Sequence, residues 1–180
     1  MGQADGLVTA PLCKASFRAA NIPFMGHTDL LQHLTNSEHV TMGFVTPSFS
    51  VALATIHIPL SEVSIQLNEP QLEQTIRHAM QLSSSSGSSY PKVAVCGLNP
   101  HAGEDGLLGN EEEEWIRPLI KRLKYEYPGL EGPFPPDTVF IQAKDKVFDT
   151  IVALYHDQGL IPVKMLHFDE AVNVSLGLPF

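Results

Sequence analysis

The sequence predicts an α/β fold with a mixed, substantially parallel sheet. Strand-like stretches alternate with amphipathic helical stretches through most of the 180 residues, a pattern typical of parallel sheets covered by helices. The continuous apolar run KVAVCGL (92–98) is typical of a strand buried inside such a sheet. Two adjacent strands around Pro47 are expected to form an antiparallel hairpin, which would make the sheet mixed.

The first third of the chain alternates short strands with short helices. Thr28 or Asp29 is placed to cap a helix that runs to about Thr35. A TPS turn separates the two hairpin strands. The elements expected here are a strand at 6–11, a helix at 14–22, the capped helix, strands at 39–46 and 49–58, and a helical connector at 60–67.

The remaining elements follow from periodicity and from glycine and proline. Residues 69–83 place Leu72, Ile76, Ala79, Met80 and Leu82 on one helical face. The acidic first turn of the 110–127 helix, Glu111 to Glu114, complements the helix dipole and is expected to be solvated. The other expected elements are a flexible serine loop at 83–89, a Pro/Gly-rich loop at 128–140, a buried strand in 149–164 that runs into a histidine-bearing loop, and a last strand at 172–180.

Composition excludes several classes of function. The net charge of −9 argues against a nucleic-acid partner, because phosphate contacts need clustered Lys and Arg. No apolar run approaches the ~20 residues that span a bilayer, and the N-terminus lacks the pattern of a signal peptide. Cys13 and Cys96 are expected to be free, buried thiols. These observations favour a cytoplasmic protein that binds neither nucleic acid nor membranes.

Three histidines stand in loop or strand-end contexts rich in Gly, Asp and Glu: His27 in GHTD, His101 in NPHAGE and His156 in YHDQG. Ligands of open α/β sheets bind outside the carboxyl ends of strands. Three neutral imidazoles there would suit a divalent ion such as zinc. Taken singly, each histidine is better explained as a turn or capping residue than as a metal ligand. The other histidines are assigned to helix surfaces, strand ends or the core: His33, His39, His57, His78 and His167.

The usual nucleotide and nucleophile motifs are absent from the sequence. It contains no GxGxxG after a strand, no GxxxxGK[ST] and no GxSxG. A nicotinamide cofactor, if one is used, must therefore be held in another way, and its contact residues stay unknown.

The motifs together resemble those of the 4-hydroxythreonine-4-phosphate dehydrogenase family. The resemblance covers almost the whole chain, and CGLNPHAGE and YHDQG are its most specific parts. It implies an isocitrate/isopropylmalate dehydrogenase-like fold and a homodimer with a shared active site. The family motifs appear in this order: LVTAPLCK, IPFMGHTDLL, VALATIHIPL, VCGLNPHAGEDG, GPFPPDT, ALYHDQGLIPVK and VNVSLGLPF.

The resemblance also implies a reaction in pyridoxal 5′-phosphate (vitamin B6) biosynthesis. NAD or NADP would oxidise the C3 alcohol of 4-phosphooxy-threonine, and loss of carbon dioxide would give 3-amino-2-oxopropyl phosphate. A divalent metal, commonly zinc and alternatively Mg or Co, would polarise the alcohol oxygen. By the same resemblance, three histidines hold the metal, and the positions matched to them are His27, His101 and His156.

Other site residues are assigned by the same resemblance. Lys164 and Asn173 match substrate-binding positions, where a Lys charge and an Asn amide suit a phosphate. Asp137 matches a position near the site and is the candidate catalytic residue, although capping of the next segment explains it equally well. Asn99 and Glu104 flank His101 and are candidates to orient it, and a role in the turn explains Asn99 equally well.

The chain departs from the family pattern in length. Family members carry a segment before LVTAP and continue past LGLPF, so residues 1–180 are expected to be an internal portion of a two-domain α/β dehydrogenase that has little activity alone. Turnover near that of a full-length relative would contradict this expectation. The alternatives are a paralogous dehydrogenase for 4-phospho-erythronate or 4-phospho-threonate and a non-catalytic metal-binding remnant.

Overall fold

The computed structural model describes residues 9, 14–24, 26–85 and 87–180. The chain divides into two compact units, Met1–Val40 with Leu178–Phe180, and Thr41–Gly177. The first unit contains α1 (Lys14–Ala19) and α2 (His27–Thr35), which confirms two predicted helices. The N-cap of α2 is Gly26, so the helix begins before the predicted caps. The strand predicted at 6–11 lies outside the described residues, apart from Thr9.

The second unit is built on a six-stranded mixed sheet in the order β4-β3-β5-β2-β1-β6. Strands β4, β3, β5 and β2 are parallel, and β1 pairs antiparallel with both β2 and β6. The predicted α/β class and hairpin are therefore confirmed. The strands are β1 (Thr41–Val45), β2 (Ser50–Leu53), β3 (Val93–Cys96), β4 (Leu130–Phe134), β5 (Thr150–Ala153) and β6 (Val172–Leu176).

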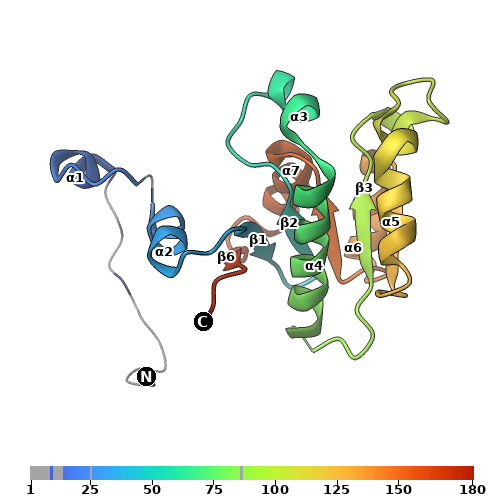
Figure 1. Cartoon of the computed structure of the whole chain (residues 1–180). Helices are drawn as coiled ribbons and strands as arrows, with labels where there is room; N and C mark the ends of the chain where they lie inside the picture. The colour runs from blue at the N-terminus through green and yellow to red at the C-terminus, as the bar shows by residue number, and fades with distance from the viewer. Residues whose placement is uncertain (1–8, 10–13, 25, 86) are drawn as a thin grey trace. The chain divides into compact units, whose positions relative to one another are not determined.

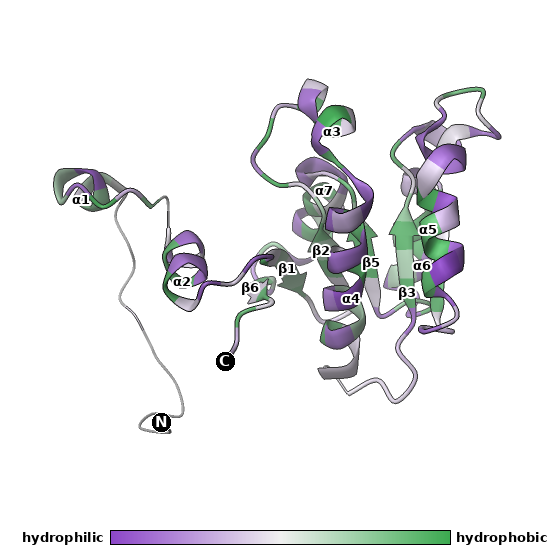
Figure 2. Ribbon diagram, viewed as in Figure 1, coloured by the Kyte–Doolittle hydropathy of each residue, from purple (hydrophilic) through white to green (hydrophobic). Residues whose placement is uncertain are grey.

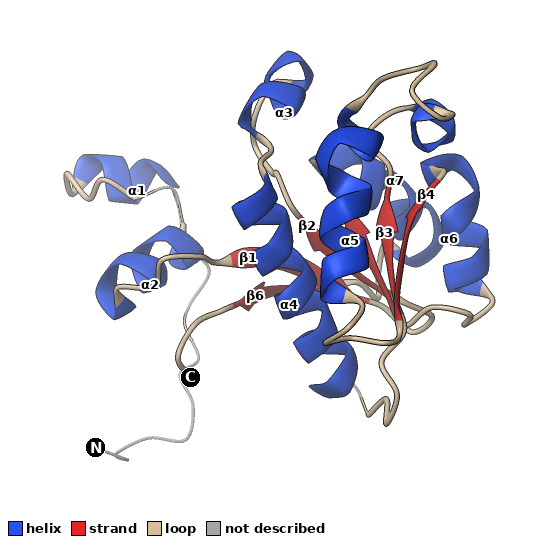
Figure 3. Ribbon diagram, turned by 45° about the vertical axis from the view of Figure 1, so that its right-hand side comes forward, coloured by secondary structure: helices blue, strands red, loops and turns tan. Residues whose placement is uncertain are grey.

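Helices cover both faces of this sheet (Figures 1 and 3). The faces follow the two-residue period of the strands: in β3, Val93 and Val95 join the core under α4 and α5, whereas Ala94 and Cys96 join the core under α6 and α7. This two-sided burial explains the continuous apolar runs of β3 and β5 (Figure 2). The helices are α3 (Leu60–Gln66), α4 (Glu69–Ser85), α5 (Arg117–Leu123), α6 (Pro136–Lys144) and α7 (His156–His167).

Three loop predictions are wrong. The histidine-bearing loop expected after the strand in 149–164 is helical from His156, where α7 begins. Residues 128–140 contain β4 and the start of α6, because pairing with β3 supplies backbone hydrogen bonds that the local composition does not reveal. The serine stretch begins inside α4, which continues to Ser85. There the Ser83 hydroxyl is buried and lies 2.7 Å from the Thr150 hydroxyl, so a tertiary hydrogen bond overrides the weak helix propensity of serine.

No helix in the described part of the chain is long and apolar enough to cross a membrane. Cys96 is a free, buried thiol, as predicted, whereas Cys13 lies outside the described residues.

Candidate functional site

The loops after the parallel strands gather at one edge of the sheet. Strands β3, β5 and β2 are neighbours, and they run in the same direction. His101 follows β3, His156 follows β5 and His57 follows β2, so all three imidazoles lie beyond the carboxyl ends of adjacent strands. This is the edge at which open α/β sheets bind ligands.

His57 and His156 form a close imidazole pair. Their ring centroids are 5.5 Å apart, with the ring planes inclined by 45°. Both side chains line a cavity of about 310 Å³, together with Tyr155 and Asp157. Two imidazoles at this separation can contribute two nitrogen ligands to one cation, because each zinc–nitrogen bond is about 2.0 Å long.

The residue after His156 orients its ring. His156 Nδ1 lies 2.6 Å from Asp157 Oδ1. A carboxylate can only accept a hydrogen bond, so this contact keeps the proton on Nδ1 and leaves the Nε2 lone pair available. A carboxylate behind a metal-binding histidine is a common arrangement in proteins.

The other two residues of the HDQG motif hold the edge together. The buried Gln158 amide donates to the Gly97 carbonyl at 2.8 Å and accepts from the Leu154 N–H at 2.7 Å. It therefore links the end of β5 to the end of β3. Gly159 allows α7 to lie against the sheet, because a Cβ there would come within 2.7 Å of Leu53 Cδ2.

The loop that carries His101 has unusual backbone geometry. His101 and Ala102 have φ values of 54° and 53°, inside a short 3₁₀ segment, Pro100–Gly103. Non-glycine residues adopt this left-handed region only at a cost in free energy, commonly near functional sites. The His101 residue is exposed, whereas Ala102 is buried beneath it.

The acidic turn that follows is not uniformly solvated. Glu112 opens a π-helical turn, Glu112–Ile116, that leads into α5, and its exposed fraction is 0%. This contradicts the predicted solvated turn for Glu112, because the π-turn directs its carboxylate inward to Asn99. Hydrogen bonds from its own backbone and from Asn99 lower the pKa of the neighbouring Glu111.

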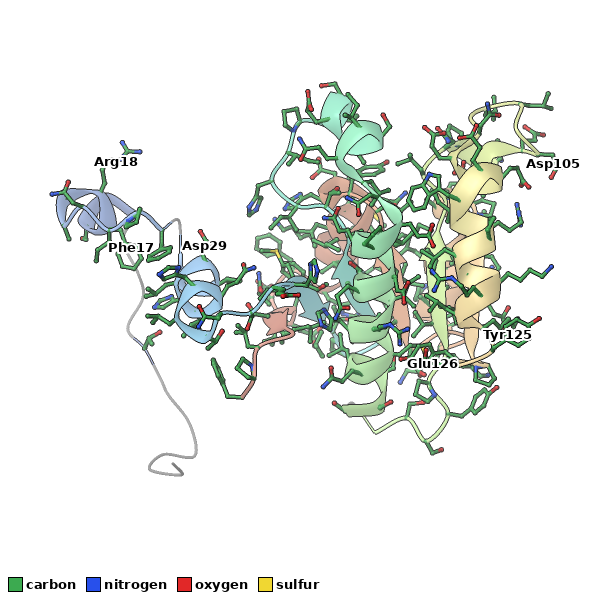
Figure 4. The ribbon with its side chains drawn as sticks, viewed as in Figure 1. Phe17, Arg18, Asp29, Asp105, Tyr125 and Glu126 are labelled. Carbon is green, nitrogen blue, oxygen red and sulfur yellow. The ribbon has the colours of Figure 1, made fainter. Side chains whose placement is uncertain are left out.

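The exposed parts of this region fit the prediction better. Glu113 and Glu114 are exposed, and Glu113 pairs with Arg117 at 2.9 Å. Figure 4 shows Asp105 on the loop after the 3₁₀ segment and Glu126 at the far end of α5. Glu126 pairs there with Arg77 at 2.7 Å, so the charges at this end belong to a surface ion-pair network.

Asp137 lies in the first turn of α6 and is exposed. The N-cap of α6 is Pro135, and the helix has no side-chain cap, so capping does not explain Asp137. Its side chain lines a second cavity of about 550 Å³ between α6 and α7, together with Tyr155 and Asp157. Burial raises the pKa of Tyr155, which lines both cavities.

The other predicted site residues lie on α7, on β6 and in the first unit. Lys164 is exposed in α7, two turns after His156, and Asn173 is exposed on β6 opposite Phe44. His27 is the first residue of α2 in the other unit. Among the residues that the structure describes, no group of three His, Cys, Asp or Glu side chains is arranged to hold a metal ion.

His57 is the residue that the sequence analysis missed. The predicted strand 49–58 placed His57 inside a strand, whereas β2 ends at Leu53. With the earlier end, His57 satisfies the same criterion as His101 and His156, since it lies just beyond an apolar strand. The signal was therefore present in the sequence, but the strand boundary concealed it.

Comparison with known proteins identifies relatives over the whole chain. The family model described as pyridoxal phosphate biosynthetic protein PdxA matches residues 1–180. A 4-hydroxythreonine-4-phosphate dehydrogenase from Pseudomonas aeruginosa is 46% identical and is matched over 99% of this chain and 55% of its own length. The corresponding protein from Desulforapulum autotrophicum is 44% identical, with 99% and 53% of the two chains matched. The chain thus spans about half the length of these curated relatives.

Solved structures agree with the fold. The 4-hydroxythreonine-4-phosphate dehydrogenase from Klebsiella pneumoniae superimposes with a TM-score of 0.88 at 42% identity, covering 95% of this chain and 52% of that one. A terephthalate 1,2-cis-dihydrodiol dehydrogenase from Burkholderia xenovorans has a TM-score of 0.79 at 28% identity, covering 89% and 52%. The predicted isocitrate/isopropylmalate dehydrogenase-like class agrees with these matches. From its family match and its relatives, the chain belongs to the PdxA family of pyridoxal phosphate biosynthetic proteins.

Proposed function

We propose that the protein acts as an NAD- or NADP-dependent 4-hydroxythreonine-4-phosphate dehydrogenase in pyridoxal 5′-phosphate biosynthesis. It would oxidise the C3 alcohol of 4-phosphooxy-threonine, with decarboxylation to 3-amino-2-oxopropyl phosphate. The observation that carries this proposal is 44–46% identity over 99% of the chain to relatives named for that activity. The family fold and the imidazoles at the carboxyl edge of the sheet agree with it.

The residues at this edge fit a divalent cation such as Zn, Mg or Co, because neutral imidazoles are common zinc ligands. We propose His101 and His156 as ligands, with His57 as the third candidate from geometry and His27 as the third candidate from the sequence. When bound, the cation would act as a Lewis acid toward the substrate hydroxyl. Asp157 would fix the ring orientation of His156. Gln158 would hold the start of α7 against the segment that leads from β3 to His101.

The other roles belong to the same proposal. Lys164 would attract the substrate phosphate as a point charge, and Asn173 would donate an amide N–H to the substrate. Asp137, which lines the cavity between α6 and α7, is the candidate to accept or deliver a proton. A homodimer would bring residues of two subunits to one site.

Metal content distinguishes the two candidates for the third ligand. Zinc bound per chain would be measured for His57→Ala, His27→Ala, His156→Ala and, as a matched control on the surface, His39→Ala. The geometry predicts that the His57 and His156 variants lose zinc and that the control retains it. Loss of zinc in the His27 variant, with retention in the His57 variant, would restore the original assignment.

The reaction itself is tested by following NADH or NADPH formation with 4-phosphooxy-threonine. A panel that adds 4-phospho-erythronate and 4-phospho-threonate tests the paralogous alternative. Preference for either of these acids would overturn the substrate assignment. Zinc binding without turnover of any of the three substrates would favour the metal-binding remnant.

A further inference from the structure

The buried Glu112 carboxylate is the feature around which the His101 loop is organised. Asn99 N–H donates to Glu112 Oε1 at 2.7 Å, and Asn99 Nδ2 donates to Glu112 Oε2 at 2.8 Å. The same amide nitrogen also donates to Glu111 Oε2 at 2.8 Å. Glu112 therefore holds both the backbone and the side chain of Asn99, through hydrogen bonds strengthened by the negative charge.

Three glycines leave the space that this arrangement needs. A Cβ at Gly97 would come within 3.1 Å of Glu112 Oε1, and one at Gly103 would come within 2.9 Å of Oε2. At Gly109, which has a φ of 144°, a Cβ would overlap the Asn99 amide. A Cβ at Gly97 would also come within 2.7 Å of Ala102 Cα. The need for glycine at 103 and 109 is thus accounted for by the fit of Asn99 against Glu112, and at 97 by the fit of both Ala102 and Glu112.

Asn99, which Glu112 holds in place, lies two residues before His101. The left-handed conformations of His101 and Ala102 cost free energy, and such conformations persist only where the surrounding structure imposes them. Glu112 holds Asn99 by hydrogen bonds, and Gln158 holds the Gly97 carbonyl, so the loop is fixed at two positions before His101. The π-turn at Glu112 also fits, since π-turns within helices are frequent at functional sites.

We infer that Glu112 is a positioning residue that, through Asn99, holds the His101 imidazole at the ligand-binding edge of the sheet. Glu112 itself does not touch the cation or the substrate in this arrangement. The inference deepens the proposed function and rests on it for the role of His101. The placement of the loop by Glu112 does not depend on that role.

Zinc affinity tests the coupling between Glu112 and His101. Zinc would be titrated calorimetrically into the wild-type chain and into Glu112→Ala, Glu112→Gln, His101→Ala and the double variant His101→Ala/Glu112→Ala. Glu112→Ala should weaken zinc binding about 10- to 100-fold, the usual effect of removing an orienting partner. Glu112→Gln should be intermediate, because its amide can accept one of the two bonds from Asn99 but not both.

Two comparisons separate positioning from general stability. Glu114→Ala is the matched control, since Glu114 is exposed two residues along the same segment, and it should leave zinc affinity unchanged. In the His101→Ala background, Glu112→Ala should have no further effect. An equal loss in both backgrounds, or wild-type affinity in Glu112→Ala, would overturn the inference.

Amide hydrogen exchange tests the loop without metal. Glu112→Gln should raise exchange at residues 97–104 by about tenfold or more, the equivalent of one lost charge-assisted hydrogen bond, whereas exchange in β5 should stay unchanged. If the wild-type chain binds no zinc, the proposed metal site fails, and the exchange data alone decide whether Glu112 holds the loop. Unchanged exchange at residues 97–104 would refute the positioning role.

Discussion

Substitution of Gly159 by alanine probes how closely α7 must approach the sheet. A Cβ at this position would come within 2.7 Å of Leu53 Cδ2, 2.8 Å of Val51 Cγ1 and 3.0 Å of Ala153 Cβ. Optimal carbon–carbon contacts are about 3.5–4.0 Å, so the new methyl would overlap its neighbours by roughly 0.5–1 Å. The three neighbours are at most 2% exposed, so they have little room to move.

The expected effect is the difference between two opposing terms. Overpacking of a dense core typically costs about 1–3 kcal/mol, whereas alanine is favoured over glycine inside a helix by about 1 kcal/mol. We therefore expect Gly159→Ala to lower the free energy of unfolding by about 1 kcal/mol, within a range of roughly 0–2. Because His156 begins α7, outward movement of the helix should also weaken zinc binding.

Urea unfolding followed by circular dichroism measures the first effect. Leu53→Ala should make space for the new methyl. The double variant should therefore lose less unfolding free energy than the two single variants lose together, by about 0.5–3 kcal/mol. Ile161→Ala, on the exposed face of α7, is the control for changes to the helix alone. A Gly159→Ala protein as stable as wild type or more stable, with additive energies in the double variant, would refute the packing argument.

Two further predictions concern titratable groups. Burial raises the pKa of the Cys96 thiol. In a Cys13→Ser background, DTNB at pH 8 should therefore label Cys96 only as fast as the protein opens. Rapid labelling of the folded protein would contradict the burial of this thiol. Hydrogen bonds from Arg122 and Arg77 lower the pKa of Glu73, so its stabilising contribution is present above the ordinary glutamate pKa and is lost as the pH falls through and below it. Glu73→Gln should flatten the dependence of the urea midpoint on pH in this acidic range, and an unchanged slope would exclude a role for Glu73 in acid unfolding.

Much of the fold could be predicted because its signals are local. The apolar runs of β3 and β5 and the helical face of Leu72 and Ile76 each lie within one short window of sequence, and all are buried as predicted. The two-sided burial of the central strands also indicated a parallel sheet. Strand β4 was missed because its segment is rich in Pro and Gly and becomes a strand only by pairing with β3.

The candidate site divides in the same way. His101 and His156 could be singled out from their motifs, and the fold places them after neighbouring strands. The sequence could not reveal that His57 lies beside His156, since 99 residues of chain separate the two rings and only the pairing of β2 with β5 joins them. The burial of Glu112 was likewise hidden, because a run of four glutamates is typical of a solvent-exposed segment. Only the fold shows that Glu112 accepts a hydrogen bond from the backbone N–H of Asn99, 13 positions earlier.

The sequence by itself therefore determined the α/β class and most helices and strands, and it singled out two histidines as candidates, because periodicity, apolar runs and motifs act over a few residues. Only the tertiary structure decided which side chains meet. The order of the strands selects the loops that share an edge, and the hydrogen bonds of Asn99, Gln158 and Asp157 fix the positions of those loops and rings. Such contacts depend on the whole sheet being assembled, and no local window of the chain records them.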